Sequence, residues 1–324
     1  PAEYAAILPT RYEHTEGYHI EPADSISAVL EQFYASRSLY TRMRQKSVDL
    51  RKIVSTHLER SSKKLDLQLK QLKDTEKRDK FKVYGELLNT YGYQVTEGAK
   101  SVEVPNYYTG EMLTIPLDET LSPLDNAKKY FARYNKLKRT FEALNTQTEE
   151  TRTEIAHLQT IQAALAIAES EDDLAQIRDE LETYGYIRRK MNGKKKQKSK
   201  SKPFHYRSSD GFDIYVGKNN FQNDELTFKV ANGNDWWFHA KGMPGSHVIV
   251  KTEGRELPDR TFEEAGRLAG YYSSGRDNEK IEIDYLQRKN VKKPNGAVAG
   301  YVIYYTNYSL TIHPDISGIE KISE

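Results

Sequence analysis

The residues with the clearest potential for chemistry lie in one stretch rich in aromatic residues and glycine, DWWFHAKGMPGSHVIV, at positions 235–250. Side chains alternate between the faces of a β-strand, so Trp237, His239 and Lys241 are predicted to share a face. The Gly-Met-Pro-Gly-Ser turn that follows offers free backbone amides beside a lysine, which can hold a phosphate. Core packing of the tryptophans and an ordinary hairpin turn explain the same residues, so both interpretations remain open. The candidates for ligand or partner binding here are Trp237, His239, Lys241, Gly245, Ser246 and His247.

A second candidate surface combines positive charge with aromatic rings. Its cations are Arg288, Lys289, Lys292 and Lys293, and its aromatic residues are Tyr285, Tyr301, Tyr304 and Tyr305. Lysine and arginine neutralise phosphates while tyrosine rings stack on unpaired bases, so this composition suits RNA. A solvated turn before a tyrosine-rich strand explains the same residues, and this alternative also remains open.

Several classes of chemistry lack the residues that they need. The chain has no cysteine, which excludes disulfides, cysteine nucleophiles and thiolate metal sites. Its eight histidines form no set with metal-ligand spacing. Ser246 and His247 are neighbours, and neighbours on a strand point to opposite faces, which does not suit a nucleophile and its base. No glycine-rich phosphate loop ending in Lys-Ser or Lys-Thr occurs. We therefore expect no enzyme activity, no metal and no cofactor.

The composition predicts a multidomain protein with an extended helical part. The chain has 324 residues, of which 30% are charged and 37% hydrophobic, and its mean hydropathy is -0.80. This is polar for a compact globule, and solvated helices account for it best. The net charge is only +2, but the residues from Arg188 to Lys202 include many basic and no acidic side chains. We expect a basic linker over 189–203, either as a solvated spacer or as a non-specific phosphate contact.

The helical part is predicted to be a long antiparallel coiled-coil hairpin. Its first helix begins near Asp24 or Ser25 and runs to about Lys82, with leucines every seven residues at Leu58, Leu65 and Leu72. The second helix carries a seam with alternating spacings of four and three: Tyr130, Tyr134, Leu137, Phe141, Leu144, Ile155, Leu158 and Leu165. Polar residues at Thr148, Thr151 and Gln162 continue the same repeat and weaken it. A seam of this length requires a facing helix.

The rest of the sequence pattern predicts the boundaries of the segments and domains. A leading segment occupies 1–23 and the helical middle domain 24–188, with a small β-element at about 91–121 between the long helices. A short helix is predicted over 171–184, with Ser170 and Asp173 as its capping box and Gly185 as its stop.

Residues 204–324 are predicted to form a β-rich α+β domain. Strands are expected over 211–217, 226–230, 236–240, 247–251, 281–286, 297–305 and 309–313. One helix interrupts them, capped by Thr261 with Glu264 three residues later. Its apolar face is predicted to hold Phe262, Ala265, Leu268, Ala269 and Tyr272.

The sequence offers no sign of membrane insertion. No window approaches the roughly 20 apolar residues that span a bilayer, and no signal peptide opens the chain. Together with the lack of cysteine, this favours the cytoplasm. The sequence begins at Pro1 rather than Met, and we expect it to be a piece of a longer protein.

Several motifs, in the same order, resemble those of the FbpA/RqcH/NEMF (NFACT) family. They are YGELL at 84–88, LSP at 121–123 followed by NAKKYFARYNKLK at 126–138, Glu180-Leu181 with GYI at 185–187, and the Asp-x-Trp-Phe-His-x-Lys-x-x-Pro-Gly-Ser-His run that starts at Asp235. The resemblance implies a middle coiled coil followed by an NFACT-R domain, without the family's N-terminal domain and helix-hairpin-helix segment.

What the resemblance implies for function is a ribosome quality-control factor. Such proteins bind a large ribosomal subunit obstructed by peptidyl-tRNA, contact rRNA and tRNA, and support alanine tailing of the stalled nascent chain. We expect the same partners here, and a monomer. Dimerisation through the coiled coil is the alternative.

Streptococcal members of the same family imply a second role. They are described as fibronectin- or fibrinogen-binding proteins that reach the cell surface without a signal peptide. Host fibronectin is therefore an alternative partner, and a surface adhesin domain, linked to virulence, is the alternative function. Basic surfaces and exposed strand edges can bind matrix proteins.

Overall fold

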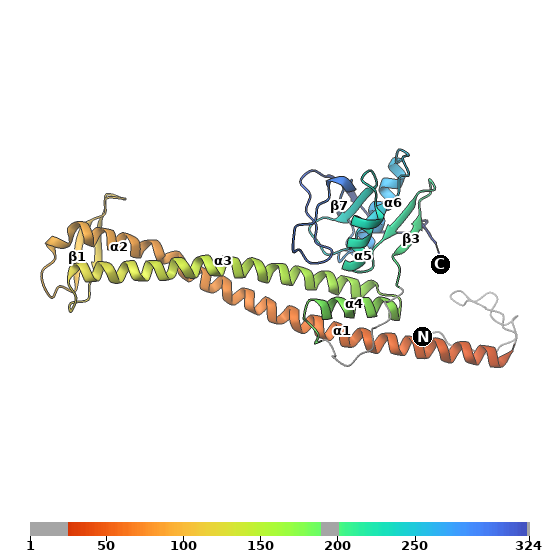
Figure 1. Ribbon diagram of the computed structural model, residues 1–324, viewed down its shortest axis with the longest axis horizontal. Coiled ribbons are helices and arrows are strands. Elements are labelled where there is room, and N and C mark those ends of the chain that lie inside the picture. Colours follow the sequence, from red (N-terminus) through yellow and green to blue (C-terminus); the bar gives the residue numbers. More distant parts are fainter. Residues whose placement is uncertain (1–24, 189–200, 323–324) are drawn as a thin grey trace. The chain divides into compact units, whose positions relative to one another are not determined.

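The computed structural model describes residues 25–188 and 201–322 of the chain (Figure 1). These residues form two compact units. The helical unit is Leu58–His157, and the sheet unit contains the described residues before Leu58 and after His157. The predicted leading segment and most of the predicted basic linker lie outside the described residues.

Long helices supply most of the helical unit. α1 spans Ile26–Asp74, and a short 3-10 turn, η2 (Thr75–Lys77), joins it to α2 (Arg78–Tyr91). α3 spans Pro123–Ile167. Ser25 begins α1 as predicted, since its Oγ accepts a hydrogen bond from the Ala28 amide at 3.2 Å. The prediction that the first helix ends near Lys82 is wrong, because the chain stays helical to Tyr91.

Aromatic residues join α2 to α3 in antiparallel order. The Arg78 guanidinium lies 3.9 Å from the centroid of the Phe141 ring, and one to two turns further along α2 the Tyr84 and Tyr130 rings are 5.2 Å apart. Leu87 is fully buried nearby. Gly85 permits this close approach, because a Cβ there would lie 2.9 Å from the Phe131 ring.

The small β-element between the helices is confirmed. β1 (Ser101–Pro105) and β2 (Met112–Pro116) form an antiparallel pair. Val104 and Ile115 are fully buried and pack in the cluster that contains Leu87. A 3-10 turn, η3 (Gly92–Gln94), precedes the pair.

The predicted seam on α3 is partly correct. Leu144, Leu158 and Leu165 are buried, whereas Tyr130, Tyr134, Leu137, Phe141 and Ile155 are partly buried. Gln162 is exposed, and Ile161, one residue earlier, is fully buried. A straight helix repeats every 3.6 residues, so its buried face drifts away from a strict seven-residue pattern.

The buried face of α1 contains more polar residues than the leucine repeat predicts. Leu58, Leu65 and Leu72 are only partly buried. The buried residues between and just after them are Ser61, Gln68 and, in η2, Thr75, whereas Leu50 and Val54 are buried earlier on α1. Gln68 is 6% exposed, and its Oε1 has no hydrogen-bond partner among the described residues.

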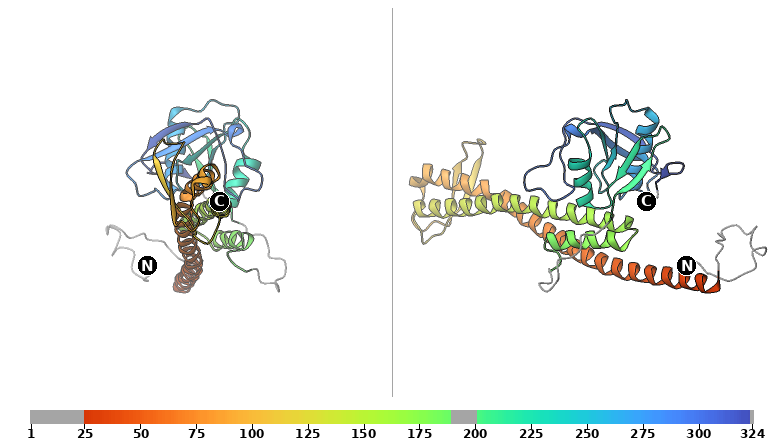
Figure 2. Two further views of the ribbon diagram at one scale, coloured as in Figure 1. Left: turned by 90° about the vertical axis from the view of Figure 1, so that its left-hand side faces the viewer. Right: turned by 45° about the vertical axis from the view of Figure 1, so that its right-hand side comes forward.

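The sheet unit contains a seven-stranded antiparallel sheet with the order β8-β7-β5-β6-β4-β3-β9 (Figures 1 and 2). Its strands are β3 (Phe204–Arg207), β4 (Asp213–Val216), β5 (Trp236–Ala240), β6 (Val248–Val250), β7 (Ile281–Gln287), β8 (Tyr308–Ile312) and β9 (Glu320–Lys321). The unit also contains α4 (Glu171–Thr183), which has the predicted Ser170 and Asp173 capping box and a left-handed Gly185 after its end.

Both faces of the sheet are covered, so strand alternation separates two buried clusters. Phe238 and Ala240 pack with α6 (Asp259–Tyr271), whose buried face contains Ala265, as predicted. Trp237 packs on the other face with Leu226 and Leu286. This face is covered by α5 (Asn220–Glu225), the π-helical turn η4 (Leu226–Val230) and the segment after η5 (Arg288–Asn290).

Three predicted features of this domain are wrong. Residues 226–230 form η4 rather than a strand. Residues 297–305 form no strand, although Ile303 makes an isolated β-bridge with Lys292. Thr261 does not cap α6, which begins earlier, at Asp259; its hydroxyl donates instead to Asp210 Oδ2 at 2.8 Å. Within the described ranges, none of the helices is apolar and long enough to cross a bilayer.

The unpartnered amide of Gln68 predicts a stabilising substitution. In Gln68→Leu the buried oxygen without a partner is removed, which relieves about 1–3 kcal/mol. Hydrogen exchange of the amides around residue 68 should slow, as measured by mass spectrometry. The exposed Gln71→Leu is the matched control. Faster exchange in Gln68→Leu than in the unaltered chain would show that the amide has a stabilising role.

Candidate nucleic-acid interface

Of the aromatic and histidine residues in the 235–250 stretch, Trp237, Phe238 and His247 are buried, whereas Trp236 and His239 are partly buried. Trp237 is fully buried and His247 is 1% exposed. The Trp237 ring stacks on His239 at 5.6 Å and meets His247 edge-on at 5.1 Å, between ring centroids. Trp237 Nε1 has no hydrogen-bond partner among the described residues. Trp237 and His247 are therefore not surface groups that a large ligand can touch in this conformation.

The histidine pair is neutral at physiological pH. Burial lowers the pKa of His239 to about 4. Burial, and then the neighbouring His239, hold the pKa of His247 well below its usual range. His247 Nδ1 lies 2.8 Å from Thr227 Oγ1, and the His247 amide donates to Asn223 Oδ1 at 3.0 Å. His247, which directly precedes β6, therefore connects that strand to α5 and η4.

The Gly-Met-Pro-Gly-Ser turn, for which the sequence left both a phosphate cradle and an ordinary hairpin turn open, uses its last amide within the protein. Ser246 is buried, and its amide donates to the Tyr272 carbonyl at 2.9 Å. Gly245 forms a β-bridge with Ser273. Lys241 is exposed, but its Nζ pairs with Glu282 Oε1 at 2.7 Å.

The second predicted set provides cations at the surface. Lys289 and Lys292 are exposed, and neither forms an ion pair with another described residue. Arg288 is partly buried and donates from Nε to the Thr227 carbonyl at 2.6 Å. Lys293 pairs with Asp224. Two of the four predicted cations are thus available to an anion.

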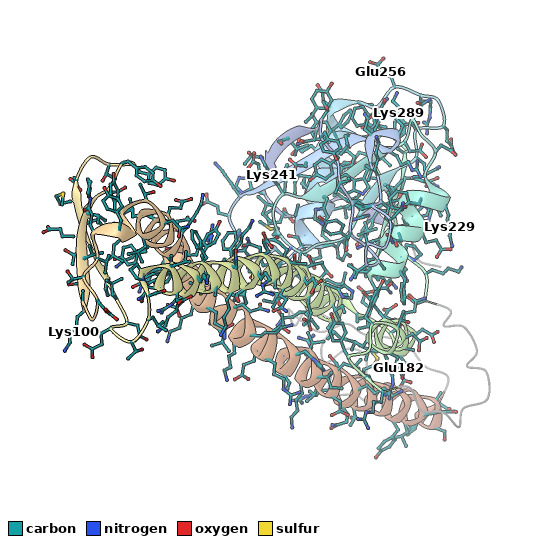
Figure 3. All side chains as sticks on the ribbon, turned by 60° about the vertical axis from the view of Figure 1, so that its left-hand side comes forward. Lys100, Glu182, Lys229, Lys241, Glu256 and Lys289 are labelled. Carbon is teal, nitrogen blue, oxygen red and sulfur yellow. The ribbon has the colours of Figure 1, made fainter. Side chains whose placement is uncertain are left out.

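Sequence reasoning missed a third exposed cation. Lys229 lies in η4 and forms no ion pair within the described part of the chain. The Arg288 contact with Thr227 holds η4 beside η5, and the Lys289 amide donates to the Gly233 carbonyl at 3.0 Å. Figure 3 shows Lys229 and Lys289 at the surface of the domain and Lys241 on a different side from Lys229. The apolar alternation of 226–230 suggested a strand, so no local signal marked the π-helical turn.

The same unit also carries exposed tyrosines. Tyr301 is 48% and Tyr305 is 83% exposed. Tyr304 points inward, 5.3 Å from the Trp237 ring, and donates to Asp284 Oδ2 at 2.8 Å. Burial, and then this hydrogen bond, raise the pKa of Tyr304. Tyr285 belongs to the other face of the sheet, where it stacks on Phe238 at 5.5 Å.

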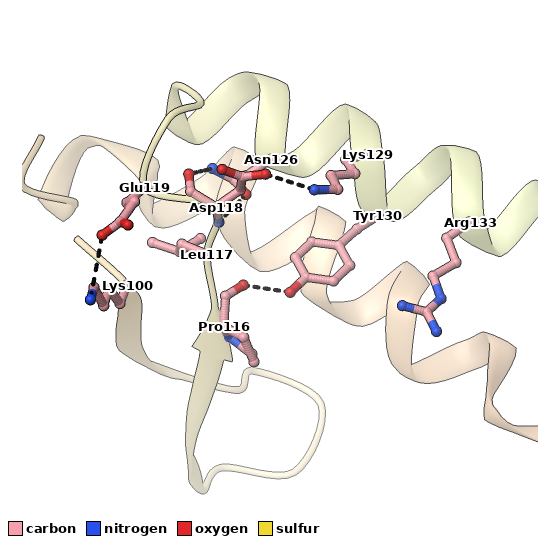
Figure 4. Close-up of a pocket in the computed structure, with 9 residues that line it drawn as sticks. All are labelled: Lys100, Pro116, Leu117, Asp118, Glu119, Asn126, Lys129, Tyr130 and Arg133. Atoms are coloured by element: carbon pink, nitrogen blue, oxygen red, sulfur yellow. Dashed lines mark hydrogen bonds and ion pairs between the residues drawn. The ribbon is translucent and has the colours of Figure 1, made fainter. Parts of the chain in front are cut away.

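The helical unit has an open pocket of about 640 Å³ beside the β1–β2 pair (Figure 4). Asn126 closes one wall, accepting from the Asp118 amide at 2.8 Å and donating to the Asp118 carbonyl at 3.1 Å. Lys129 pairs with Asp118 at 2.8 Å, and this contact, followed by those of Thr120, lowers the pKa of Asp118 to about 2. The lining residues are Lys100, Pro116, Leu117, Asp118, Glu119, Asn126, Lys129, Tyr130 and Arg133. Groups of three or more metal-ligating side chains are absent from the described residues.

Known proteins resemble this chain over most of its length. The chain is 39% identical over 300 residues to the "Rqc2 homolog RqcH" of Streptococcus suis, covering 92% of this chain and 54% of that protein. It is 35% identical over 305 residues to the "Rqc2 homolog RqcH" of Bacillus subtilis, covering 93% and 53%. The chain thus spans about half the length of these curated relatives.

A solved structure and two family matches complete the comparison. The C-terminal part of the fibronectin/fibrinogen-binding protein from Streptococcus suis superposes with a TM-score of 0.68 and 33% identity, over 87% of this chain and 100% of that one. Residues 1–200 match the NFACT N-terminal and middle domains, and residues 202–304 match the NFACT protein RNA binding domain. This protein is therefore a member of the NFACT family.

Proposed function

We propose that this protein acts in ribosome-associated quality control. In this proposal it binds rRNA and tRNA on a large ribosomal subunit obstructed by peptidyl-tRNA, in the cytoplasm, and supports alanine tailing without being an enzyme itself. Support comes from the RNA binding domain match and from relatives that are named as Rqc2 homologs.

One observation carries the RNA part of the proposal. Lys229, Lys289 and Lys292 are exposed without ion pairs among the described residues, in the same domain as the exposed rings of Tyr301 and Tyr305. Free cations engage phosphates, and exposed rings stack on unpaired bases.

The other candidate residues have supporting roles in this proposal. Trp237 packs with Leu226 of η4 and with Val291 after η5, and His247 contacts Thr227 of η4, while the partly buried His239 stacks on Trp237. Ser246 and Gly245 fix the start of β6 by their contacts with Tyr272 and Ser273. Arg288, Lys293 and Lys241 already have partners in the protein. In this proposal they therefore contribute to the local electrostatic potential rather than to direct phosphate contacts.

We further propose that α1, α2 and α3 form a continuous antiparallel coiled coil in a monomeric protein. The order of contacts in the helical unit supports it, since Arg78 meets Phe141 and Tyr84 meets Tyr130. Each helix then finds its partner within the same chain, and light scattering that reports a dimer would contradict this arrangement.

A second candidate function is binding of host fibronectin at the cell surface. The similar Streptococcus suis structure, named for a fibronectin/fibrinogen-binding protein, is the observation in its favour. Saturable binding to immobilised fibronectin at physiological salt would support this role, and binding that disappears at that salt would contradict it.

Charge reversal tests whether Lys289 and Lys292 contact RNA. Lys289→Glu and Lys292→Glu should each weaken binding to purified large-subunit rRNA and reduce the salt slope by about 1, because each loses one phosphate contact. Lys280→Glu, also exposed and without an ion pair among the described residues, is the matched control. Fluorescence anisotropy titrations at several salt concentrations measure both quantities. Equal losses of RNA affinity in all three variants would show a general charge effect and contradict a specific RNA contact at Lys289 and Lys292.

The histidine pair predicts a pH dependence of stability rather than of binding. The folded pKa of His239 is lowered to about 4, so its contribution is complete above the unfolded value of about 6.5 and is lost as pH falls toward 4. The thermal midpoint should fall in this window, and less steeply in His239→Gln. The exposed His313→Gln is the control. A thermal midpoint that is flat from pH 6.5 to 4 in the unaltered chain would refute the buried neutral pair.

A further inference from the structure

The segment 291–307, which carries Lys292, Tyr301 and Tyr305, has little regular structure. Lys292 and Ile303 form a β-bridge across it. The Lys292 amide donates to the Ile303 carbonyl at 2.9 Å, and the Ile303 amide donates to the Lys292 carbonyl at 2.8 Å. A segment of this length needs further anchors to hold one conformation, because each ordered residue loses backbone entropy. We call it the RNA-facing loop, a name that rests on the proposed function.

Two carboxylates fix this loop to the sheet unit. Asp224 of α5 accepts the Gly300 amide at 3.0 Å and pairs with Lys293. Asp284 of β7, which is 4% exposed, accepts the Tyr304 hydroxyl and the Asn307 side-chain amide, both at 2.8 Å. These contacts hold the two ends of the stretch from 293 to 307.

The third anchor comes from outside the RNA binding domain. The Tyr184 hydroxyl, at the C-terminal cap of α4, accepts the Ala299 amide at 2.6 Å. Ala299 is 5% exposed, so loss of this bond would leave a buried donor without a partner. Tyr184 belongs to the part of the chain that matches the NFACT N-terminal and middle domains, whereas Ala299 belongs to the RNA binding domain.

A second contact from α4 supports the same part of the loop. Asn220 Nδ2 donates to Glu180 Oε1 and to Thr160 Oγ1, each at 2.7 Å. Its Oδ1 packs directly under Gly300, where a Cβ would lie only 2.4 Å away. Gly300 also has a φ of +77°, so this position combines a left-handed backbone with close contact to a buried amide.

Further hydrogen bonds hold α4 against α5. Gln176 Oε1 accepts from the side chains of Asn219 and Gln222 at 2.7 and 2.8 Å. Lys218 Nζ lies 3.3 Å from Asp173 Oδ1. Asn219, Gln222 and Asp173 are all buried, so this interface is a specific polar contact rather than a loose surface encounter.

We propose that α4 of the middle region is a positioning element of the RNA-binding site, with Tyr184 and Glu180 as its positioning residues. They hold the 297–301 part of the loop in the conformation that presents Lys292, Tyr301 and Tyr305. Because RNA binding and the docking of α4 favour the same loop conformation, the two are thermodynamically coupled, and RNA must in turn stabilise the α4 contact. The RNA-binding module is thus larger than the domain that carries the cations.

The test removes the Tyr184 hydroxyl oxygen in the full chain. Tyr184→Phe should accelerate hydrogen exchange in peptides covering residues 297–304, and should weaken binding of a fluorescein-labelled oligouridylate about fivefold or more, the lower range of such couplings. Tyr271→Phe, on α6, is the matched control and should change neither. In the unaltered chain the oligouridylate should also slow exchange across α4, and this protection should be reduced in Tyr184→Phe. A purely structural role would not produce this last effect.

The outcomes separate the two proposals. Unchanged loop exchange in Tyr184→Phe would overturn the positioning role. Faster loop exchange with unaltered RNA affinity would overturn the coupling. An unaltered chain that binds no oligouridylate and no rRNA would overturn the proposed function and the coupling together, while loop exchange would still decide whether Tyr184 holds the loop. Glu180→Gln keeps an oxygen that accepts from Asn220, so it should retain most of the affinity, whereas Glu180→Ala should lose it.

Discussion

The RNA binding domain depends on one constraint. The irregular loop at 291–307 must be held in place by contacts that do not pair all of the nearby lysine side chains with carboxylates. Lysine side chains are strong partners for carboxylates, and the chain contains almost as many acidic as basic residues. The buried carboxylate of Asp284 accepts instead from the neutral donors Tyr304 and Asn307, and also from Ser309. The Tyr184 hydroxyl accepts from a backbone amide. Only Lys293 takes part in anchoring, which leaves Lys289 and Lys292 unpaired within the described residues.

Buried aromatic side chains beneath the loop also hold it in place. Trp237 fills the space beneath Tyr304, and His247 connects β6 to the η4 turn through Thr227. A charged histidine there would be costly to bury, and both rings remain neutral because burial lowers their pKa. Trp237 and His247, from the most distinctive motif of the sequence, thus lie beneath the surface and do not form it.

How far the sequence predicted these features depends on what each pattern encodes. Alternation in 236–240 placed Trp237 and Phe238 on opposite faces correctly. It carries no information about whether a face is covered, so it could not decide between core packing and ligand contact for Trp237. The capping box of α4 was predictable because Ser170 and Asp173 make it locally. The π-helical turn at 226–230 and the loop at 297–305 depend on long-range contacts such as Arg288 with Thr227 and Tyr184 with Ala299. In the long helices the polar buried face, with Gln68, was hidden because a heptad search looks for apolar residues.

The most direct test of this account is a density map of the chain on an isolated large ribosomal subunit that carries peptidyl-tRNA. The account predicts that Lys289 and Lys292 lie against RNA phosphates, with the Tyr184 contact to Ala299 still formed. A map in which the 291–307 loop faces solvent, while another surface of the protein contacts the RNA, would contradict it.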